Sequence, residues 1–167
     1  MRFEDIDPDW SWMSGKHRGL AEWLPRVCEH FAVSKSILAD HFAFVEAFKH
    51  ATPDQPALTR HARWKQIRAD CPKWLVEQLV RLRPRLLILC GSAGKDIIAP
   101  LLFDERTAGG MRRTRVREIH GRTAFVQLDD LRIPVVFTFA ISGQTVARWR
   151  AHPATTTVRT AVLRALS

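Results

Sequence analysis

Cysteine is scarce in this sequence, and long apolar runs are absent from it. The 167 residues include three cysteines, Cys28, Cys71 and Cys90, which are odd in number and show no CxxC spacing. This pattern argues against a disulfide framework and a zinc site, and it predicts reduced thiols in an apolar core. We therefore expect no metal and no other cofactor.

The sequence also offers nothing that suits a membrane or a secretion signal. No apolar run approaches the roughly 20 residues that cross a bilayer. The start, Met1 to Pro8, is too acidic and too broken for a signal peptide. We expect a cytoplasmic protein without a membrane partner. Repeats are absent too, so the length predicts a single domain over 1–167, with an irregular acidic lead over about 1–16.

Acidic residues are outnumbered by basic ones. Seventeen Asp and Glu face 26 Lys and Arg, a formal net charge of +9. A high pI with clustered arginine is typical of proteins that bind a phosphate backbone, because the guanidinium fork matches phosphate oxygens. A solvated basic loop is the alternative interpretation. The cluster consists of four arginines within six residues: Arg112, Arg113, Arg115 and Arg117.

The chain is organised around an apolar run from Leu86 to Cys90. Pro84 precedes this run and the turn Gly91-Ser92-Ala93-Gly94 follows it. The pattern predicts a buried strand that leads into a helix. A strand without polar alternation is expected in a parallel sheet that is covered on both faces. Ligands bind at the carboxyl ends of such strands, so this turn is the first place to look for a site.

The remaining periodicities predict helices alternating with strands, and hence an α/β fold. More finely, they suggest a three-layer α/β/α arrangement with a short, mostly parallel central sheet. Trp64 and Trp74 are expected in the core, Pro25 is expected to split a helix or mark its second half, and Cys71-Pro72 is expected to restart one. Residues 104–121 suggest an exposed loop or short edge pieces. Helices are predicted over 17–31, 58–69, 72–82 and 155–166, the last with a threonine cap, and strands over 41–49, 86–90, 123–128 and 133–139. The residues of 41–49 also suit a helix.

The turn after the central strand is not a Walker loop. Two residues separate Gly91 from Gly94, where that loop needs four, and Asp96 follows Lys95 in place of Ser or Thr. Nucleotide hydrolysis is therefore not expected. The NH groups at the helix terminus remain candidates for holding one backbone phosphate.

Three segments, 44–49, 82–94 and 133–143, resemble in this order the later parts of the uracil-DNA glycosylase superfamily, and the resemblance covers roughly 42–166. In that family one strand carries an Asn that reads the uracil, often with a Lys three residues on. Another strand ends in Gly and a small-residue turn, and the last runs into a His-Pro-Ser loop that grips the minor groove. The resemblance implies base recognition by Glu46 and Lys49. It implies DNA contacts by Gly91, Ser92, Ser142, Gly143 and Gln144. The arginine cluster is a further candidate for DNA contacts because of its charge.

The chain departs from that family at three points. Glu46 stands at the Asn position, and a carboxylate accepts a hydrogen bond from a cytosine amino group but cannot donate to a uracil carbonyl. Ala140-Ile141-Ser142 stands at the His-Pro-Ser position, unless His152-Pro153-Ala154 is the counterpart. The family's first strand and water-activating loop have no equivalent before residue 40.

These departures leave the catalytic residues unassigned and several functions open. The first is a divergent glycosylase-like protein that binds DNA, flips a base and excises it or only holds it. The second is an inactive module on the same fold that binds a nucleic acid or a protein partner. The third is an α/β domain whose basic surface has no polynucleotide role. The oligomeric state is left open.

Overall fold

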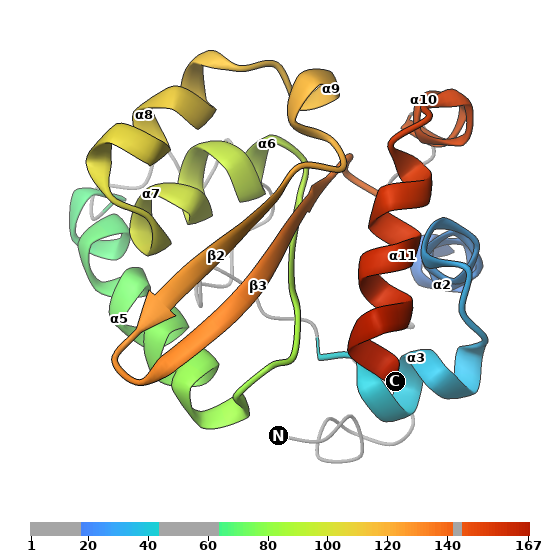
Figure 1. Ribbon diagram of the computed structural model, residues 1–167, viewed down its shortest axis with the longest axis horizontal. Helices are drawn as coiled ribbons and strands as arrows, with labels where there is room; N and C mark the ends of the chain where they lie inside the picture. Colours follow the sequence, from blue (N-terminus) through green and yellow to red (C-terminus); the bar gives the residue numbers. More distant parts are fainter. Residues whose placement is uncertain (1–17, 44–63, 142–144) are drawn as a thin grey trace.

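The computed structural model describes residues 18–43, 64–141 and 145–167, and in this part of the chain helices flank a small sheet (Figure 1). The sheet has the strand order β1-β3-β2, with β1 at Leu87–Cys90, β2 at Thr123–Leu128 and β3 at Leu131–Thr138. β1 runs parallel to β3, whereas β2 pairs with β3 in the antiparallel sense. The α/β class is thus confirmed, and the described sheet is mixed, with one parallel and one antiparallel pairing.

The strands form where the apolar patterns predicted them. β2 and β3 make a hairpin in which Leu128 pairs with Leu131, and the turn between them uses Asp129 at a φ of 50°. Asp tolerates this left-handed conformation better than most residues. β3 lies in the middle of the sheet and is buried on both faces, which explains its run of apolar residues without polar alternation.

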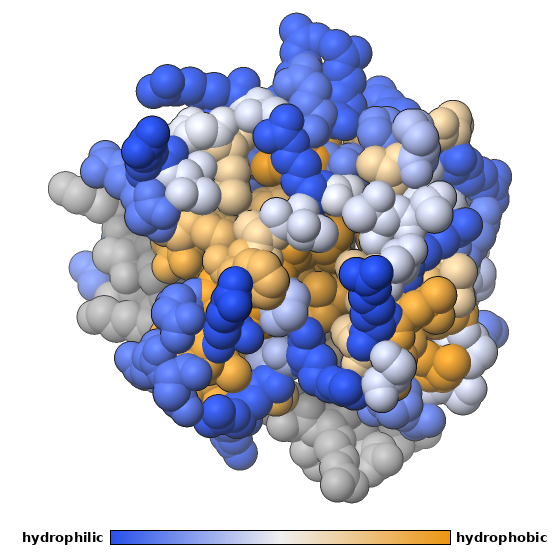
Figure 2. Space-filling view, in the orientation of Figure 1, coloured by the Kyte–Doolittle hydropathy of each residue, from blue (hydrophilic) through white to orange (hydrophobic). Residues whose placement is uncertain are grey.

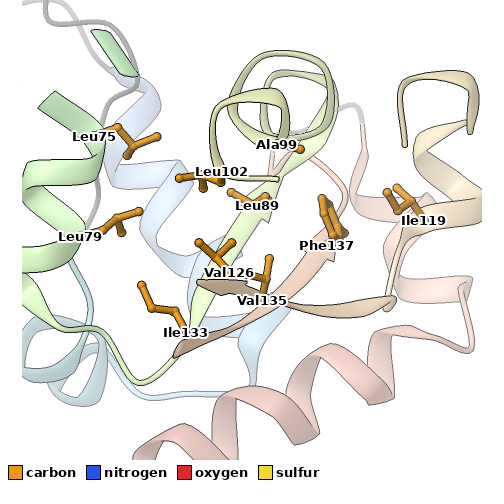
Figure 3. Close-up of a cluster of buried hydrophobic side chains, with 10 residues drawn as sticks. All are labelled: Leu75, Leu79, Leu89, Ala99, Leu102, Ile119, Val126, Ile133, Val135 and Phe137. Carbon is orange, nitrogen blue, oxygen red and sulfur yellow. The ribbon is translucent and has the colours of Figure 1, made fainter. Parts of the chain in front are cut away.

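One face of the sheet packs against α5, at Trp64–Leu82, and α7, at Ala99–Leu102. Figure 3 shows Leu75 and Leu79 of α5 on one side of this core and Ile119 and Phe137 at its far end. The strands contribute side chains from alternate positions, so their faces follow the two-residue period of a strand. The buried members of this first core are Leu75, Leu79, Leu89, Ala99, Leu102, Ile119, Val126, Ile133, Val135 and Phe137.

The opposite face packs against α2 (Arg18–Phe31), α3 (Lys35–His41) and α11 (Thr155–Leu166). Val136 of β3 points into this second core, because it alternates with Val135 and Phe137 of the first. Val158 and Val162 of α11 are buried there, as the periodicity of the closing helix predicted. The second core contains Val27, Phe31, Val33, Leu38, Val136, Ile141, Val158 and Val162.

The helices of the N-terminal half differ from the predictions in several details. The Ser34 side chain caps α3 by accepting a hydrogen bond from the backbone NH of Ile37 at 3.2 Å. α2 continues through Pro25, whose side chain is exposed, so the proline does not split the helix. α5 likewise runs unbroken past Cys71-Pro72, and the predicted restart there is wrong. Most of the predicted strand 41–49 lies outside the described residues, and His41 itself ends α3.

The segment 104–121 is helical, so the predicted loop is wrong. It forms α8 at Glu105–Arg113 and α9 at Val116–Ile119. The Asp104 carboxylate caps α8 by accepting from the Thr107 NH at 2.9 Å, and Ala108 and Ile119 are buried. The arginines and the pair Gly109-Gly110 concealed this helix, because each glycine costs roughly 1 kcal/mol relative to alanine.

Short helices connect the main elements. β1 leads into α6 at Gly91–Ala93, a π-helical turn η2 at Gly94–Ile98, and then α7. α10, at Val146–Ala151, was not predicted. The threonine cap of α11 is wrong as well, because Ala154 occupies the cap position and Thr155 is buried. No helix in the described ranges is long and apolar enough to span a membrane.

Three further side chains differ from expectation. Trp74 is 55% exposed, so it does not belong to the core. Cys28 is half-buried and Cys90 is exposed, whereas core thiols were expected. The reason is the same for Trp74 and Cys90, because both lie at the edge of an apolar segment whose other residues fill the core.

Shortening a central side chain should cost a measurable part of the stability. Ile133 is fully buried in the first core, and we expect Ile133→Val to lower the free energy of unfolding by about 0.5–1.5 kcal/mol. Urea denaturation measures this change. Leu163→Ala is the control, because Leu163 is 56% exposed, and a loss above about 0.5 kcal/mol there would contradict the packing.

Candidate nucleic-acid interface

The carboxyl ends of β1 and β3 lie side by side because these strands are parallel neighbours. Their last paired residues are Cys90 and Thr138. Gly91, directly after β1, has a φ of 65°, and a Cβ added to it would lie 2.8 Å from the Cβ of Ala140. Both the left-handed backbone and the close approach require glycine here. The two segments that follow the strands therefore touch.

The predicted site residues in these two segments are only partly described. Gly91 is buried and Ser92 is exposed. After β3, Ala140 is exposed and the next side chain, Ile141, is buried in the second core. The structure thus brings Gly91 next to Ala140, the first residue of the predicted Ala140-Ile141-Ser142 counterpart. Five predicted site residues lie outside the described residues: Glu46, Lys49, Ser142, Gly143 and Gln144.

A buried lysine connects the arginine cluster to the same end of the sheet. Lys95 of η2 donates from Nζ to the backbone carbonyl of Arg112 at 3.1 Å and also pairs with Asp96. A cation is favoured at this position, because Arg112 lies in the last turn of α8, where the helix dipole is negative. Lys95 therefore holds α8 against the turn that follows β1. Figure 1 shows α6, α9 and α10 at the end of the sheet where β3 ends.

All four arginines of the cluster are exposed. Arg112 and Arg113 close α8, Arg115 precedes α9 and Arg117 lies on it. Glu118 is the acidic neighbour: it accepts from the backbone NH of Arg115 at 3.2 Å and lies 3.9 Å from the Arg117 guanidinium. A pair this long and exposed neutralises little charge. The cluster therefore presents a positive surface at this end of the molecule.

Behind the end of β3 lies a buried network of histidines and threonines. His30 of α2 is hydrogen-bonded through Nε2 to the Thr138 hydroxyl at 2.6 Å. His120, just after α9, is bonded through Nε2 to the Thr155 hydroxyl at 2.9 Å. Both histidines are almost fully buried. The network thus ties α2, α9 and α11 to the last residues of β3.

The hydrogen bonds determine the protonation of His120. Its Nδ1 accepts from the backbone NH of Phe139 at 3.3 Å, so the ring proton of the neutral form is on Nε2 and is donated to Thr155. The Thr155 hydroxyl in turn donates to the carbonyl of Trp149 at 2.5 Å. Burial, followed by the nearby His152, lowers the pKa of His120 to about 4.

His30 is neutral for similar reasons. Burial is the main cause that lowers its pKa to about 4, and the charges of His120 and Arg159 add to the effect. Among the described residues its Nδ1 has no hydrogen-bond partner, and neither has Nε1 of the fully buried Trp149, which lies edge-on to the same ring at 4.6 Å between centroids. Sequence reasoning missed this network, because four of its members are scattered along the chain without a shared spacing.

The end of β3 shows which of the two predicted segments follows the last strand. β3 ends at Thr138, so Ala140-Ile141-Ser142 comes next, and His152 follows only after α10. The ring of His152 lies 4.9 Å from that of His120, and its Nδ1 accepts from the backbone NH of Ala154 at 3.3 Å. In the described part of the chain no three His, Cys, Asp or Glu side chains are placed to hold a metal ion.

The described residues at this end of the sheet include exposed hydrogen-bond donors and buried histidines. This end offers exposed guanidinium groups and the Ser92 hydroxyl, whereas His30 and His120 are buried, hydrogen-bonded and neutral. A general acid or base has to reach its substrate, and these two rings do not. The chain matches no protein-family model, and no curated protein matches it significantly.

Proposed function

We propose that this chain is a divergent uracil-DNA glycosylase-like protein that binds DNA at the carboxyl ends of β1 and β3. The observation that carries the proposal is the convergence at this edge of three segments far apart in sequence. Gly91 touches Ala140, and Lys95 holds the end of α8 beside them. Guanidinium groups position a duplex by its phosphates, and small residues let the backbone approach closely.

The finer architecture that we propose is a three-layer α/β/α sandwich. Its support is that α5 and α7 cover one face of the sheet while α2 and α11 cover the other. A further strand paired in parallel with this sheet would make the sheet mostly parallel, as the sequence pattern suggests. In this arrangement Glu46 and Lys49 read a flipped base, and the Glu46 carboxylate favours an amino-bearing base such as a modified cytosine.

Binding without excision is the second candidate function. It is favoured by the residues that follow β3, since exposed Ala140 and buried Ile141 carry no group that assists departure of a base. The nearby His30 and His120 cannot take over this role, because each ring is buried and is hydrogen-bonded to a threonine hydroxyl. A partner-binding module on the same fold would share this geometry. An active enzyme would serve DNA repair, and we propose a cytoplasmic location for either form.

An excision assay separates the two candidates. Duplexes that contain uracil or a modified cytosine are incubated with the protein and then cleaved with alkali at any abasic site. Strand breakage that is lost in Glu46→Ala and kept in Glu77→Ala supports excision, because Glu77 is an exposed carboxylate on α5, away from the sheet end. Binding without breakage supports the inactive module, and the absence of both contradicts the proposed function.

A further inference from the structure

Two hollows meet at the edge strand β2, next to the proposed interface, since Thr123 pairs with Val136 near the carboxyl end of β3. The first, about 480 Å³, lies between α8, α9 and β2 and has Met111, Ile119 and Phe137 in its lining. The second, about 270 Å³, lies between β2 and α11. Thr123, the first residue of β2, lines both. We call the two hollows together the threonine groove.

Hydroxyl groups and arginines make up most of the polar lining of the threonine groove. Arg122 lies in the first hollow and Arg164 in the second, and among the described residues that line them none is acidic. Neither guanidinium has a hydrogen bond or an ion pair to a described side chain, and both residues are exposed. The six threonines are Thr107, Thr114, Thr123, Thr156, Thr157 and Thr160.

An exposed aromatic ring continues the groove along β2. Phe125 lies two residues after Thr123, so its side chain is on the same face of the strand, about 7 Å further on. Its ring is 54% exposed, and the guanidinium of Arg132 lies 3.9 Å from the ring centroid. Figure 2 shows apolar surface in the middle of this face with hydrophilic side chains around it. Such a ring offers a surface on which a base can stack.

We propose that the threonine groove binds single-stranded nucleic acid across the edge of β2. The positive charge follows a line, with one arginine in each hollow, so it suits a chain of phosphates better than one small anion. Threonine hydroxyls donate to phosphate oxygens, and Phe125 stacks only on a base that is not already paired and stacked in a duplex. The groove shares a nucleic-acid partner with the proposed function but none of its residues.

Fluorescence anisotropy with labelled oligothymidylate at several salt concentrations tests this inference. We expect the double variant Arg122→Gln/Arg164→Gln to bind about tenfold more weakly and to lower the slope of log affinity against log salt by about 1.4. The control Arg81→Gln/Arg85→Gln removes the same charge from exposed arginines near the other end of β1, and should bind within about twofold of the unchanged protein.

A second variant tests the stacking without changing the charge. Phe125→Leu keeps an apolar side chain and removes the aromatic face, and we expect a loss of about fivefold or more in oligothymidylate affinity. If both variants bind as the unchanged protein does, or if the control pair loses as much as the groove pair, the groove is not a single-strand site. Competition by thymidine monophosphate at equal phosphate concentration would also overturn it, because that result indicates a small-anion pocket.

The same assay tests this inference separately from the proposed function. Replacing Arg112, Arg113, Arg115 and Arg117 should weaken duplex binding and leave the effect of Arg122→Gln/Arg164→Gln on oligothymidylate in place. If duplex binding is absent while the groove variants still weaken single-strand binding, the groove stands and the proposed function fails. If the groove variants have no effect while duplex binding persists, the proposed function stands and the inference about the groove fails.

Discussion

We expect acid to unfold this protein at a higher pH than protonation of its surface carboxylates alone would. We expect the free energy of unfolding to fall as the pH drops from about 6.5 to about 4, by about 1.4 kcal/mol per pH unit for each of His30 and His120. The folded pKa values of both are about 4, below the ordinary value of 6.5. The unfolded chain therefore takes up protons in this window and the folded chain does not. Above pH 6.5 both histidines are neutral in either state, and their contribution to stability is complete.

The groups around the two rings support this direction. The electrostatic effects of His120 and Arg159 on His30, and of His152 on His120, lower the pKa of each ring and so oppose its protonation. Glu29 acts the other way on His30, but burial is the largest cause. Protonation of His120 would also place a donor on Nδ1 opposite the NH of Phe139. The hydrogen bond there would be lost.

Urea denaturation at a series of pH values measures the effect. His120→Gln should be less stable at pH 7 by about 1–3 kcal/mol, since buried hydrogen bonds are disturbed, but its dependence on pH should be weaker by about 1.4 kcal/mol per unit. His41→Gln is the control, because His41 is exposed at the end of α3. An unchanged pH dependence in His120→Gln would contradict a buried neutral His120.

A methyl group at Gly91 should separate the two segments of the proposed DNA interface. We expect Gly91→Ala to lower the free energy of unfolding by about 2–5 kcal/mol. The left-handed φ of 65° costs a non-glycine residue about 1–2 kcal/mol. The new Cβ would lie 2.8 Å from the Cβ of Ala140, which adds a packing cost of about 1–3 kcal/mol.

The matched double variant distinguishes these two causes. Ala140→Gly removes the clashing methyl, so Gly91→Ala/Ala140→Gly should recover the packing part and keep the backbone part. Thermal or urea unfolding of the two single variants and the double variant gives the coupling between the sites. A loss below about 0.5 kcal/mol in Gly91→Ala, or additive effects of the two substitutions, would show that the segments do not meet.

The sequence predicted the strands better than the helices. The run from Leu86 to Cys90 and the two segments of the hairpin were identified because apolar and β-branched residues dominate them. The α8 segment was missed, because its cap, Asp104, resembles a loop residue and its glycines and arginines mask a helix in which only Ala108 is buried. Prolines were weighted too heavily, since α2 and α5 continue through Pro25 and Pro72.

The candidate site was predictable where it depends on topology and not where it depends on tertiary contacts. Parallel strands bring Gly91 and Ala140 to one edge, which the pattern implied. The contact of Lys95 with Arg112 and the network around His120 join distant residues, so no local signal reveals them. The sequence does contain a signal of the threonine groove, because Thr156, Thr160 and Arg164 are spaced four residues apart and so lie on one face of α11.

Duplex binding as a function of salt tests the proposed interface most directly. A labelled duplex with one unpaired modified cytosine is titrated with the unchanged protein and with the variant in which Arg112, Arg113, Arg115 and Arg117 are glutamine. We predict tight, salt-sensitive binding by the unchanged protein, weakened at least about tenfold in the variant, with a salt slope smaller by about 3.6. Binding that is absent, or equally tight and equally salt-dependent in both proteins, would contradict a DNA interface at the carboxyl ends of β1 and β3.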